Sequence, residues 1–364
     1  MAVSVMSSVN GMSNGVSGLL SRLFTRKPSV DLSRLDHVQL PPVSATLSTD
    51  KSEITKNDEG KLLEPFSYYR EVLSGKGLRK ALLQAFNYHL NLPQTWVDGI
   101  VAIIEDLHNS SLLIDDIEDE SPLRRGSPTA HIKFGVAPTI NSANYVYFLV
   151  MEKITTLARA HASGTDFDTA TARMVSAYVE EMLELHRGQG MEIWWRTNRV
   201  CPTVDEYLVM IERKTAGLLR LGVRLLQCHP DAKTDLPLAS ISEQIGVFYQ
   251  LRDDYINLAS TSYSTQKGFA EDISEGKYSF PMIHSLMVAP DSGLKEILDK
   301  RPEDIPEKQR AIEIMRRTHS FEASVQCLQE VADRLKAQIK ALGGSPGLEA
   351  FMNQLGVDKI DAGP

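Results

Sequence analysis

Cysteine is scarce in this sequence, and the spacing does not suggest any pairing. The 364 residues include only Cys201, Cys228 and Cys327, and none stands in a C-x-x-C pair. This odd, scattered set excludes a disulfide framework and a cysteine zinc site, and it is typical of a reducing compartment. The longest uncharged stretch, residues 134–151, is interrupted by Pro138, so it does not predict a membrane-spanning helix.

Positive charge is also in short supply. The chain has 39 Lys and Arg against 47 Asp and Glu, a formal net charge of -8 at pH 7. Such a balance lacks the basic footprint of nucleic-acid-binding proteins. It would also repel polyphosphates unless Lys and Arg were gathered locally. We therefore expect a cytoplasmic protein with no nucleic-acid partner and no integral membrane segment.

The first sixty residues have little that could be buried. They contain eleven Ser and a single Phe, with no Trp, Tyr or Cys. We predict that residues 1–60 form a disordered extension and that residues 61–360 form the folded domain. Arg22 and Arg26 precede the first acidic residue, Asp31, which is a weak signature of organelle targeting. An uncut flexible tail is the alternative.

The rest of the chain has helical periodicity. Between Ser320 and Gly343, for example, Leu328, Leu335 and Ile339 share one helical face. Alternating runs typical of strands are absent. The sequence therefore predicts a single all-α domain of about a dozen helices.

An acidic stripe follows a helix predicted near residues 94–119. At 100° per residue, one face of this helix carries His108, Ser111, Asp115 and Asp119, with Asp116 beside it. The other faces are apolar. A single stripe of this kind is usually a solvated surface.

A second predicted helix repeats the pattern. Gln250, Asp253 and Asn257 fall at i, i+3 and i+7, and most of the remaining circumference is apolar. Such a helix is largely buried, and buried carboxylates need a cation or a hydrogen-bond donor. Two acidic stripes facing one cavity would repel each other unless metal ions lay between them. Ligand sets made only of oxygen favour a hard cation, and Mg²⁺ fits best.

Cationic clusters lie at the ends of predicted helices. They are Lys76 and Arg79 in a Gly-rich helix start, Arg124 and Arg125 after the first stripe, Lys214 with Thr215, and Lys267 and Lys277 after the second stripe. Each cluster alone is most often an exposed charge. Together, in an acidic chain, they favour a diphosphate site.

Six motifs in a fixed order carry a resemblance. They read GKGLRKAL (75–82), LHNSSLLIDDIEDESPLRRG (107–126), GQGMEIWWR (188–196), RKTAGLL (213–219), FYQLRDDYINL (248–258) and KGFAEDISEGKYSFP (267–281). Over residues 64–357 the sequence resembles the trans-isoprenyl diphosphate synthase family, in the fungal and animal type that makes geranylgeranyl diphosphate. Asn257 ends the second motif, as in that type, whereas Glu192 stands where members often carry Asp.

The resemblance implies a helical bundle around a central cavity, three Mg²⁺ ions per site and a homodimer or higher homo-oligomer. It implies condensation of isopentenyl diphosphate with dimethylallyl, geranyl or farnesyl diphosphate to give mainly a C20 product. Metal ligands would be Asp115, Asp119 and Asp253, with Asp116 assisting. The allylic diphosphate would contact Arg124, Lys214, Thr215, Gln250, Asn257, Lys267 and Lys277. Isopentenyl diphosphate would contact Lys76, Arg79, His108 and Arg125.

The role of Ser110 and Ser111 and the choice between a synthase, a cyclase and a silent subunit stay open at this point. Ser110 and Ser111 either leave a chain-length wall open beneath the substrate or simply allow close helix packing. A class I terpene cyclase shares the fold but needs an Asn-Asp-x-x-Ser-x-x-x-Glu motif, which the sequence lacks. A catalytically silent partner subunit would be expected to have lost acidic residues.

Overall fold

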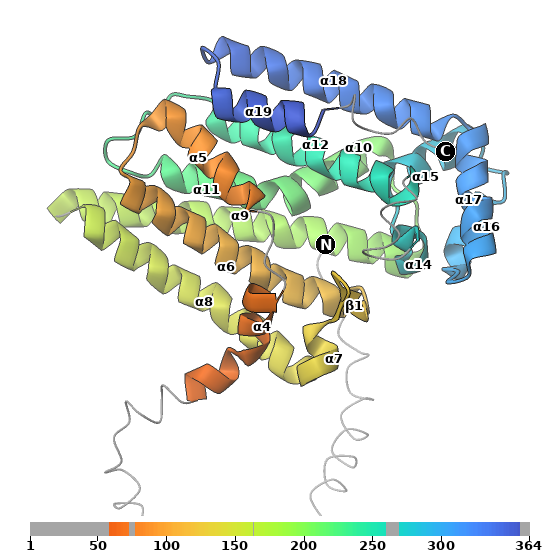
Figure 1. Ribbon diagram of the computed structural model, residues 1–364, viewed down its shortest axis with the longest axis horizontal. Helices are drawn as coiled ribbons and strands as arrows, with labels where there is room; N and C mark the ends of the chain where they lie inside the picture. The colour runs from red at the N-terminus through yellow and green to blue at the C-terminus, as the bar shows by residue number, and fades with distance from the viewer. Residues whose placement is uncertain (1–57, 73–76, 163, 260–268, 357–364) are drawn as a thin grey trace, which may run out of the picture. The chain divides into compact units, whose positions relative to one another are not determined.

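The computed structural model describes residues 58–72, 77–162, 164–259 and 269–356 (Figure 1). The chain divides into two units, Met1–Asn57 and Asp58–Pro364, and the described residues all belong to the second. Most of the predicted extension, together with Lys76 and Lys267, therefore lies outside the described residues.

The described chain is almost entirely helical, which confirms the predicted fold class. Its helices are α4 (Glu64–Val72), α5 (Leu78–Leu90), α6 (Gln94–Glu118), α7 (Ala130–Phe134), α8 (Val136–His161), α9 (Gly164–Asn198), α10 (Val204–Ile211), the π-helix η2 (Glu212–Ala216), α11 (Gly217–Leu226), α12 (Leu238–Ala259), α14 (Glu271–Glu275), α15 (Phe280–Val288), α16 (Leu294–Lys300), α17 (Ile305–Arg317), α18 (Ser320–Ala341) and α19 (Pro346–Gln354). Within the described residues, no helix is long and apolar enough to cross a membrane.

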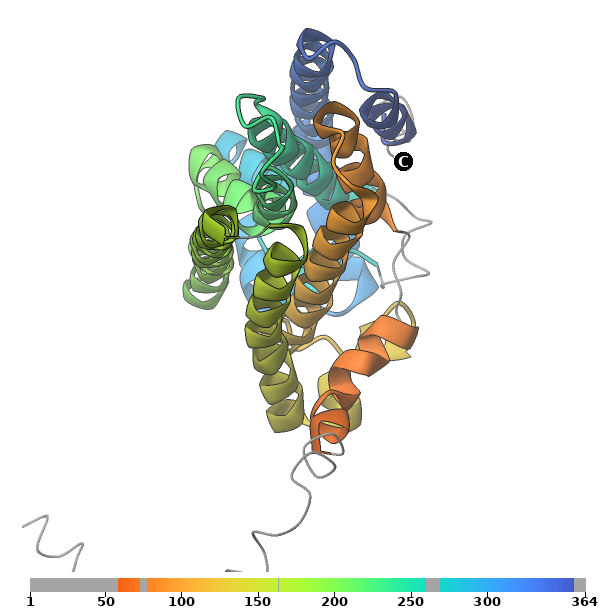
Figure 2. The ribbon, with the colours of Figure 1, turned by 90° about the vertical axis from the view of Figure 1, so that its left-hand side faces the viewer.

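Helix α6 packs against α5, α8 and α11. Its apolar face includes Trp96, Ile100 and Ile104, which have no exposed surface. Burial of each such side chain contributes about 1.5–3 kcal/mol. Figure 2 shows α8 beside α6, with α9 next to α8. These contacts fix the end of α6 that carries the acidic stripe.

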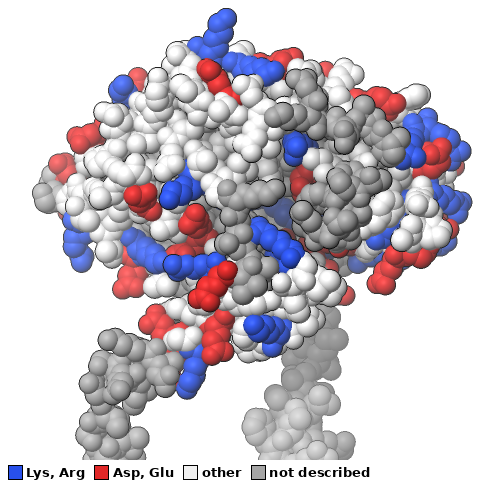
Figure 3. Space-filling view, in the orientation of Figure 1, with Lys and Arg blue, Asp and Glu red and all other residues white. Residues whose placement is uncertain are grey.

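Helix α12, which carries the second stripe, packs against α11, η2 and α18. The predicted helix near residues 320–343 is α18, and Leu328, Leu335 and Ile339 are buried as expected. Charged side chains of both signs lie side by side over the face shown in Figure 3.

A two-residue hairpin departs from the all-helical prediction. Strands β1 (Leu123–Arg124) and β2 (Ser127–Pro128) pair antiparallel directly after α6. Arg125 and Gly126 between them have φ of 52° and 79°, which is the geometry of a tight hairpin turn. The turn separates the two arginines, because Arg124 lies in the strand and Arg125 lies at the exposed tip.

Candidate active site

Asp116 is the most buried carboxylate of the first stripe. Its side chain is only 1% exposed. Both of its oxygens accept hydrogen bonds from Arg124 Nε, at 2.7 and 2.9 Å, and the Tyr69 hydroxyl donates to Oδ2. Arg124 Nη2 also lies 3.4 Å from Asp115 Oδ2. A charge removed from water is stable only with such partners, so Asp116 positions Arg124 beside Asp115.

Asp119, the last residue of the stripe, binds two cations from distant segments. Arg196 Nη1 lies 2.6 Å from Oδ1, and Lys277 Nζ lies 2.7 Å from Oδ2. The Asp119 side chain is only 3% exposed. Burial by itself would lower the pKa of Lys277, but the neighbouring carboxylates raise it well above its usual value. Lys277 therefore stays charged at this site.

Asp115 contacts side chains of η2 and α9. Lys214 Nζ lies 3.6 Å from its Oδ1 and 2.8 Å from Glu192 Oε1, and Gln189 Nε2 lies 3.3 Å from the same Asp115 oxygen. Burial would raise the pKa of Asp115, but Lys214, Lys277 and Arg124 outweigh it and hold that pKa well below its usual range. The carboxylate is therefore ionised at neutral pH.

Lys and Arg side chains lie among the carboxylates of the first stripe and offset part of their mutual repulsion. These side chains belong to Arg124, Arg196, Lys214 and Lys277. The predicted Arg124, Lys214 and Lys277 are thereby brought together around one set of carboxylates.

The sequence reasoning missed Tyr69 and a polar stripe on α9. Gln189, Glu192 and Arg196 fall at i, i+3 and i+7 on that helix and contact Asp115, Lys214 and Asp119 respectively. The spacing is the same as in the second acidic stripe, so it was visible in the sequence. No sequence pattern pointed to Tyr69, because its contact with Asp116 spans 47 positions of the chain.

The second stripe, on α12, is tied to neighbouring elements. Thr215 Oγ1 donates to Gln250 Oε1 at 2.7 Å, and Gln250 Nε2 donates to Asp254 Oδ1 at 2.7 Å. Asn257 Oδ1 accepts from Asp272 N at 3.4 Å. Burial raises the pKa of Asp254 to about 6. Asp253 lies between Gln250 and Asn257 in the sequence and is partly buried. It is the carboxylate of the second stripe.

A cluster of positive charge that includes Arg124 lies around His108. The pKa of His108 falls well below its usual value, first because of burial and then because of Arg79, Arg124 and Arg125. The pKa of Arg79 is lowered by burial and by Arg125. The structure thus brings together three of the four residues predicted to bind isopentenyl diphosphate. A neutral imidazole among three guanidinium groups suits an anion.

Comparison with known proteins shows the family of the chain. Residues 59–315 match the family model described as polyprenyl synthetase. The chain belongs to the polyprenyl synthetase family. It is 55% identical to a geranylgeranyl pyrophosphate synthase of Rhodocybe pseudopiperita over 309 residues, which cover 84% of this chain and 87% of that protein.

Two further relatives of similar coverage have different names. A geranylgeranyl pyrophosphate synthase of Clitopilus passeckerianus is 51% identical over 350 residues, covering 91% of this chain and 99% of that protein. A protein of Matsumurasca onukii called terpene synthase is 43% identical over 302 residues, covering 82% and 94%.

The donor set of this polyprenyl synthetase fits Mg²⁺. Among the described residues, no three His, Cys, Asp or Glu side chains are arranged to bind a metal by themselves. Magnesium usually takes one or two protein carboxylates and completes its shell with water and substrate phosphates. Asp115 and Asp119 offer such oxygens at the end of α6, next to the cations that would meet a diphosphate.

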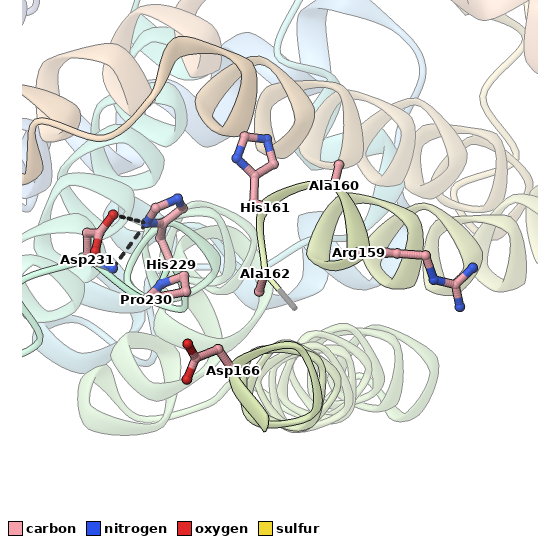
Figure 4. A pocket seen from close by; sticks show the side chains of 8 residues that line it. All are labelled: Arg159, Ala160, His161, Ala162, Asp166, His229, Pro230 and Asp231. Atoms are coloured by element: carbon pink, nitrogen blue, oxygen red, sulfur yellow. Dashed lines mark hydrogen bonds and ion pairs between the residues drawn. The ribbon is translucent and has the colours of Figure 1, made fainter. Parts of the chain in front are cut away.

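A separate polar pocket of about 430 Å³ lies near the start of α6, at the end of the helix away from Asp115. Arg159, His161, Asp166, His229 and Asp231 line it, and His229 contacts Asp231 (Figure 4). None of the predicted site residues is among its lining residues. The pocket is therefore not the site of the predicted chemistry.

The π-helix η2 presents Lys214 and Thr215, and two glycines allow its neighbours to approach it. A Cβ on Gly188 of α9 would lie 2.5 Å from Lys214 N, and one on Gly246 of α12 would lie 2.5 Å from Ala216 Cα. Real Cβ atoms essentially never approach so closely. Single π-helical turns are frequent at functional sites, and here the two glycines fix where the turn lies.

Gly188→Ala is expected to displace η2 and thereby Lys214. Overpacking of this kind costs about 1–3 kcal/mol, so both the melting temperature and turnover should fall. Gly190→Ala is the matched control, because Gly190 lies on the same helix and has no atom within 4 Å of its Cβ position. Equal turnover in the two variants would contradict the role given to Gly188.

Proposed function

We propose that this chain condenses isopentenyl diphosphate with allylic diphosphates and releases mainly geranylgeranyl diphosphate. The observation that carries the proposal is the convergence of Arg124, Lys214 and Lys277 on the carboxylates at the end of α6. Such a mixed set can hold both a metal ion and a diphosphate. The relatives that bear the name geranylgeranyl pyrophosphate synthase support the same activity.

On the allylic side, Arg124, Lys214 and Lys277 bind the diphosphate and stabilise the charge that develops on it as the allylic C–O bond breaks. Asp115, Asp119 and Asp253 would hold magnesium, three ions in the family pattern. Bound magnesium supplies further positive charge to the leaving diphosphate. Thr215 and Gln250, hydrogen-bonded to each other, keep Lys214 and α12 in fixed relation.

On the other side, Arg79, His108 and Arg125 hold the diphosphate of isopentenyl diphosphate. Its double bond then forms the new C–C bond with the allylic cation, and a proton leaves the adjacent carbon to the released diphosphate. The reaction needs no nucleophilic side chain. Its cation must be kept from water, and the apolar flanks of α6 and α12 provide that surrounding.

A prenyl cyclase is the second candidate, because one relative is called a terpene synthase. A cyclase would leave the Arg79, His108 and Arg125 cluster without a ligand. The test incubates the protein with Mg²⁺, farnesyl diphosphate and labelled isopentenyl diphosphate, with an EDTA control. A labelled diphosphate one isoprene unit longer supports the synthase, an unlabelled hydrocarbon supports the cyclase, and no turnover supports a silent subunit.

Product length depends on which serine faces the substrate. Ser110 is fully buried and donates to Ala143 O on α8 at 2.7 Å, so its small size serves helix packing. Ser111 is exposed, donates to His108 O at 2.9 Å and lies one turn before Asp115. It is therefore about 6 Å along the helix from that carboxylate. Of the two, Ser111 is the one placed to line a prenyl chain.

Ser111→Phe is expected to shift the product from C20 toward farnesyl diphosphate, because the ring would form a floor beneath the chain. Ser110→Phe should instead lower stability, since it would push α8 away from α6. Chain lengths are measured after dephosphorylation, at identical substrate ratios. A folded Ser111→Phe variant that still releases only C20 would place the wall on another helix.

We further propose that the chain forms a homodimer through α8 and α9. On α9, Val179, Leu183 and Trp194 share one helical face and are about half exposed, and Phe148 on α8 is 76% exposed. Large exposed apolar side chains on adjoining helices are typical of a protein interface. Sedimentation velocity should give twice the 40.5 kDa chain mass. A monomer at all concentrations would contradict this assembly.

A further inference from the structure

Residues 301–308, which join α16 to α17 and include the first turn of α17, hold the residues that lead to Lys277. Lys308, in the first turn of α17 and only 6% exposed, donates from Nζ to Phe269 O at 2.8 Å. Ser274 Oγ, within α14, donates to Pro302 O at 3.0 Å. Figure 1 shows α14 beside α16 and α17. Phe269 and Ser274, which both precede Lys277, are therefore anchored to this segment.

Arg301 reaches the two places from which Asp119 is bound. Its Nη2 donates to Arg196 O at 2.7 Å. Its side chain also passes over Gly276, where a Cβ would lie 2.4 Å from Arg301 Nε. Gly276 has φ of +73° and directly precedes Lys277. Arg301 thus joins α9 to residues 269–277, next to both cations that bind Asp119.

Lys308 is not explained as an ordinary solubilising charge. Burial lowers its pKa, and a buried ammonium needs partners. Its Nζ donates to a main-chain carbonyl rather than being left in water. Arg301 is an exposed residue, yet its guanidinium donates to main chain and packs over a glycine. Both side chains therefore act on backbone position.

We propose that Arg301 and Lys308 are positioning residues for the allylic-diphosphate side of the site. Arg301 sets the spacing between Arg196 and Lys277, and Lys308 fixes the main chain at Phe269, ahead of Lys277. Both residues would act on Asp119 through Arg196 and Lys277. The proposal rests on the proposed function, since Lys277 is given its role by that chemistry.

The test compares Arg301→Ala and Lys308→Met with wild type in the full-length chain. Arg310→Ala is the matched control, because Arg310 lies on α17 with a 62% exposed side chain that pairs only loosely with Glu307. Lys308→Arg is the conservative variant that can still donate to Phe269 O. The readouts are the KM for each substrate, the Mg²⁺ concentration for half-maximal rate, and hydrogen exchange of the amides of residues 269–277 without substrate.

Each of the two variants should raise the KM for farnesyl diphosphate and the Mg²⁺ requirement about tenfold, the effect of one lost hydrogen bond to a charged group. The KM for isopentenyl diphosphate should change less than twofold, the amides of residues 269–277 should exchange faster, and Lys308→Arg should recover most of the loss. If Lys308→Met does not fold, the kinetics of Arg301→Ala, a change at an exposed residue, decide whether the proposal holds.

Unchanged kinetics, or equal increases in both KM values, would overturn the positioning role. Exchange of these amides equal to that of wild type would do the same. These outcomes are distinct from failure of the proposed function, which would be seen as wild-type protein that does not elongate farnesyl diphosphate.

Discussion

Asp115→Asn and Asp119→Asn are each expected to lower kcat by about a hundredfold or more, the effect of removing one preorganised charge from a closed site. Asparagine keeps the size of the side chain and one oxygen but removes the negative charge. Lys214 and Gln189 would lose the anion that they contact at Asp115, and Arg196 and Lys277 would lose theirs at Asp119. Steady-state rates at saturating Mg²⁺ and substrates measure the effect.

The two variants should differ in stability. Asp119 and Arg196 are 3% and 7% exposed, so Asp119→Asn leaves a buried guanidinium without its anion. Asp115 is 24% exposed, so its loss is better tolerated. Glu120→Gln, an exposed carboxylate in the next position, is the control and should keep full activity. A folded Asp115 or Asp119 variant with near-wild-type turnover would contradict the metal assignment.

Arg124→Ala and Arg125→Ala are expected to have different effects although the residues are adjacent. Arg124 pairs with Asp116, whose side chain is 1% exposed. Breaking such a buried pair costs about 3–5 kcal/mol, so Arg124→Ala should lower the melting temperature strongly and raise the KM for the allylic substrate. Arg125 lies at the exposed tip of the hairpin. Arg125→Ala should lower the melting temperature much less than Arg124→Ala does and raise the KM for isopentenyl diphosphate.

Thermal unfolding together with the two Michaelis constants tests this contrast. An equal loss of stability in both variants would contradict the contrast in burial between Arg124 and Arg125. The same kinetic change in both variants would mean that the two diphosphates do not occupy the separate clusters assigned to them.

Helical spacing predicted which stripe residues share a face, but not what lies opposite. The alignment of Asp115 with Asp119 follows from 100° per residue. The predicted helix near residues 94–119 corresponds to α6, Gln94–Glu118. The partners Arg196 and Tyr69 come from elsewhere in the chain, and only folding brings them to Asp119 and Asp116.

Neighbouring residues on one helix show a second limit. Ser110 and Ser111 differ by 100° of rotation, which places one against α8 and leaves the other exposed. The rotation of α6 is set by its packing on α5, α8 and α11. The π-helix at residues 212–216 was likewise not predicted, because it follows from the close approach of Gly188 and Gly246 rather than from any local pattern.

The most direct measurement is the length of the labelled product formed from farnesyl diphosphate and labelled isopentenyl diphosphate in the presence of Mg²⁺. We predict that, after dephosphorylation, most of the label is in geranylgeraniol for the wild type and that the label is about a hundredfold lower for Asp115→Asn. Equal labelling by the two proteins, or no label in any C20 alcohol from the wild type, would contradict the account.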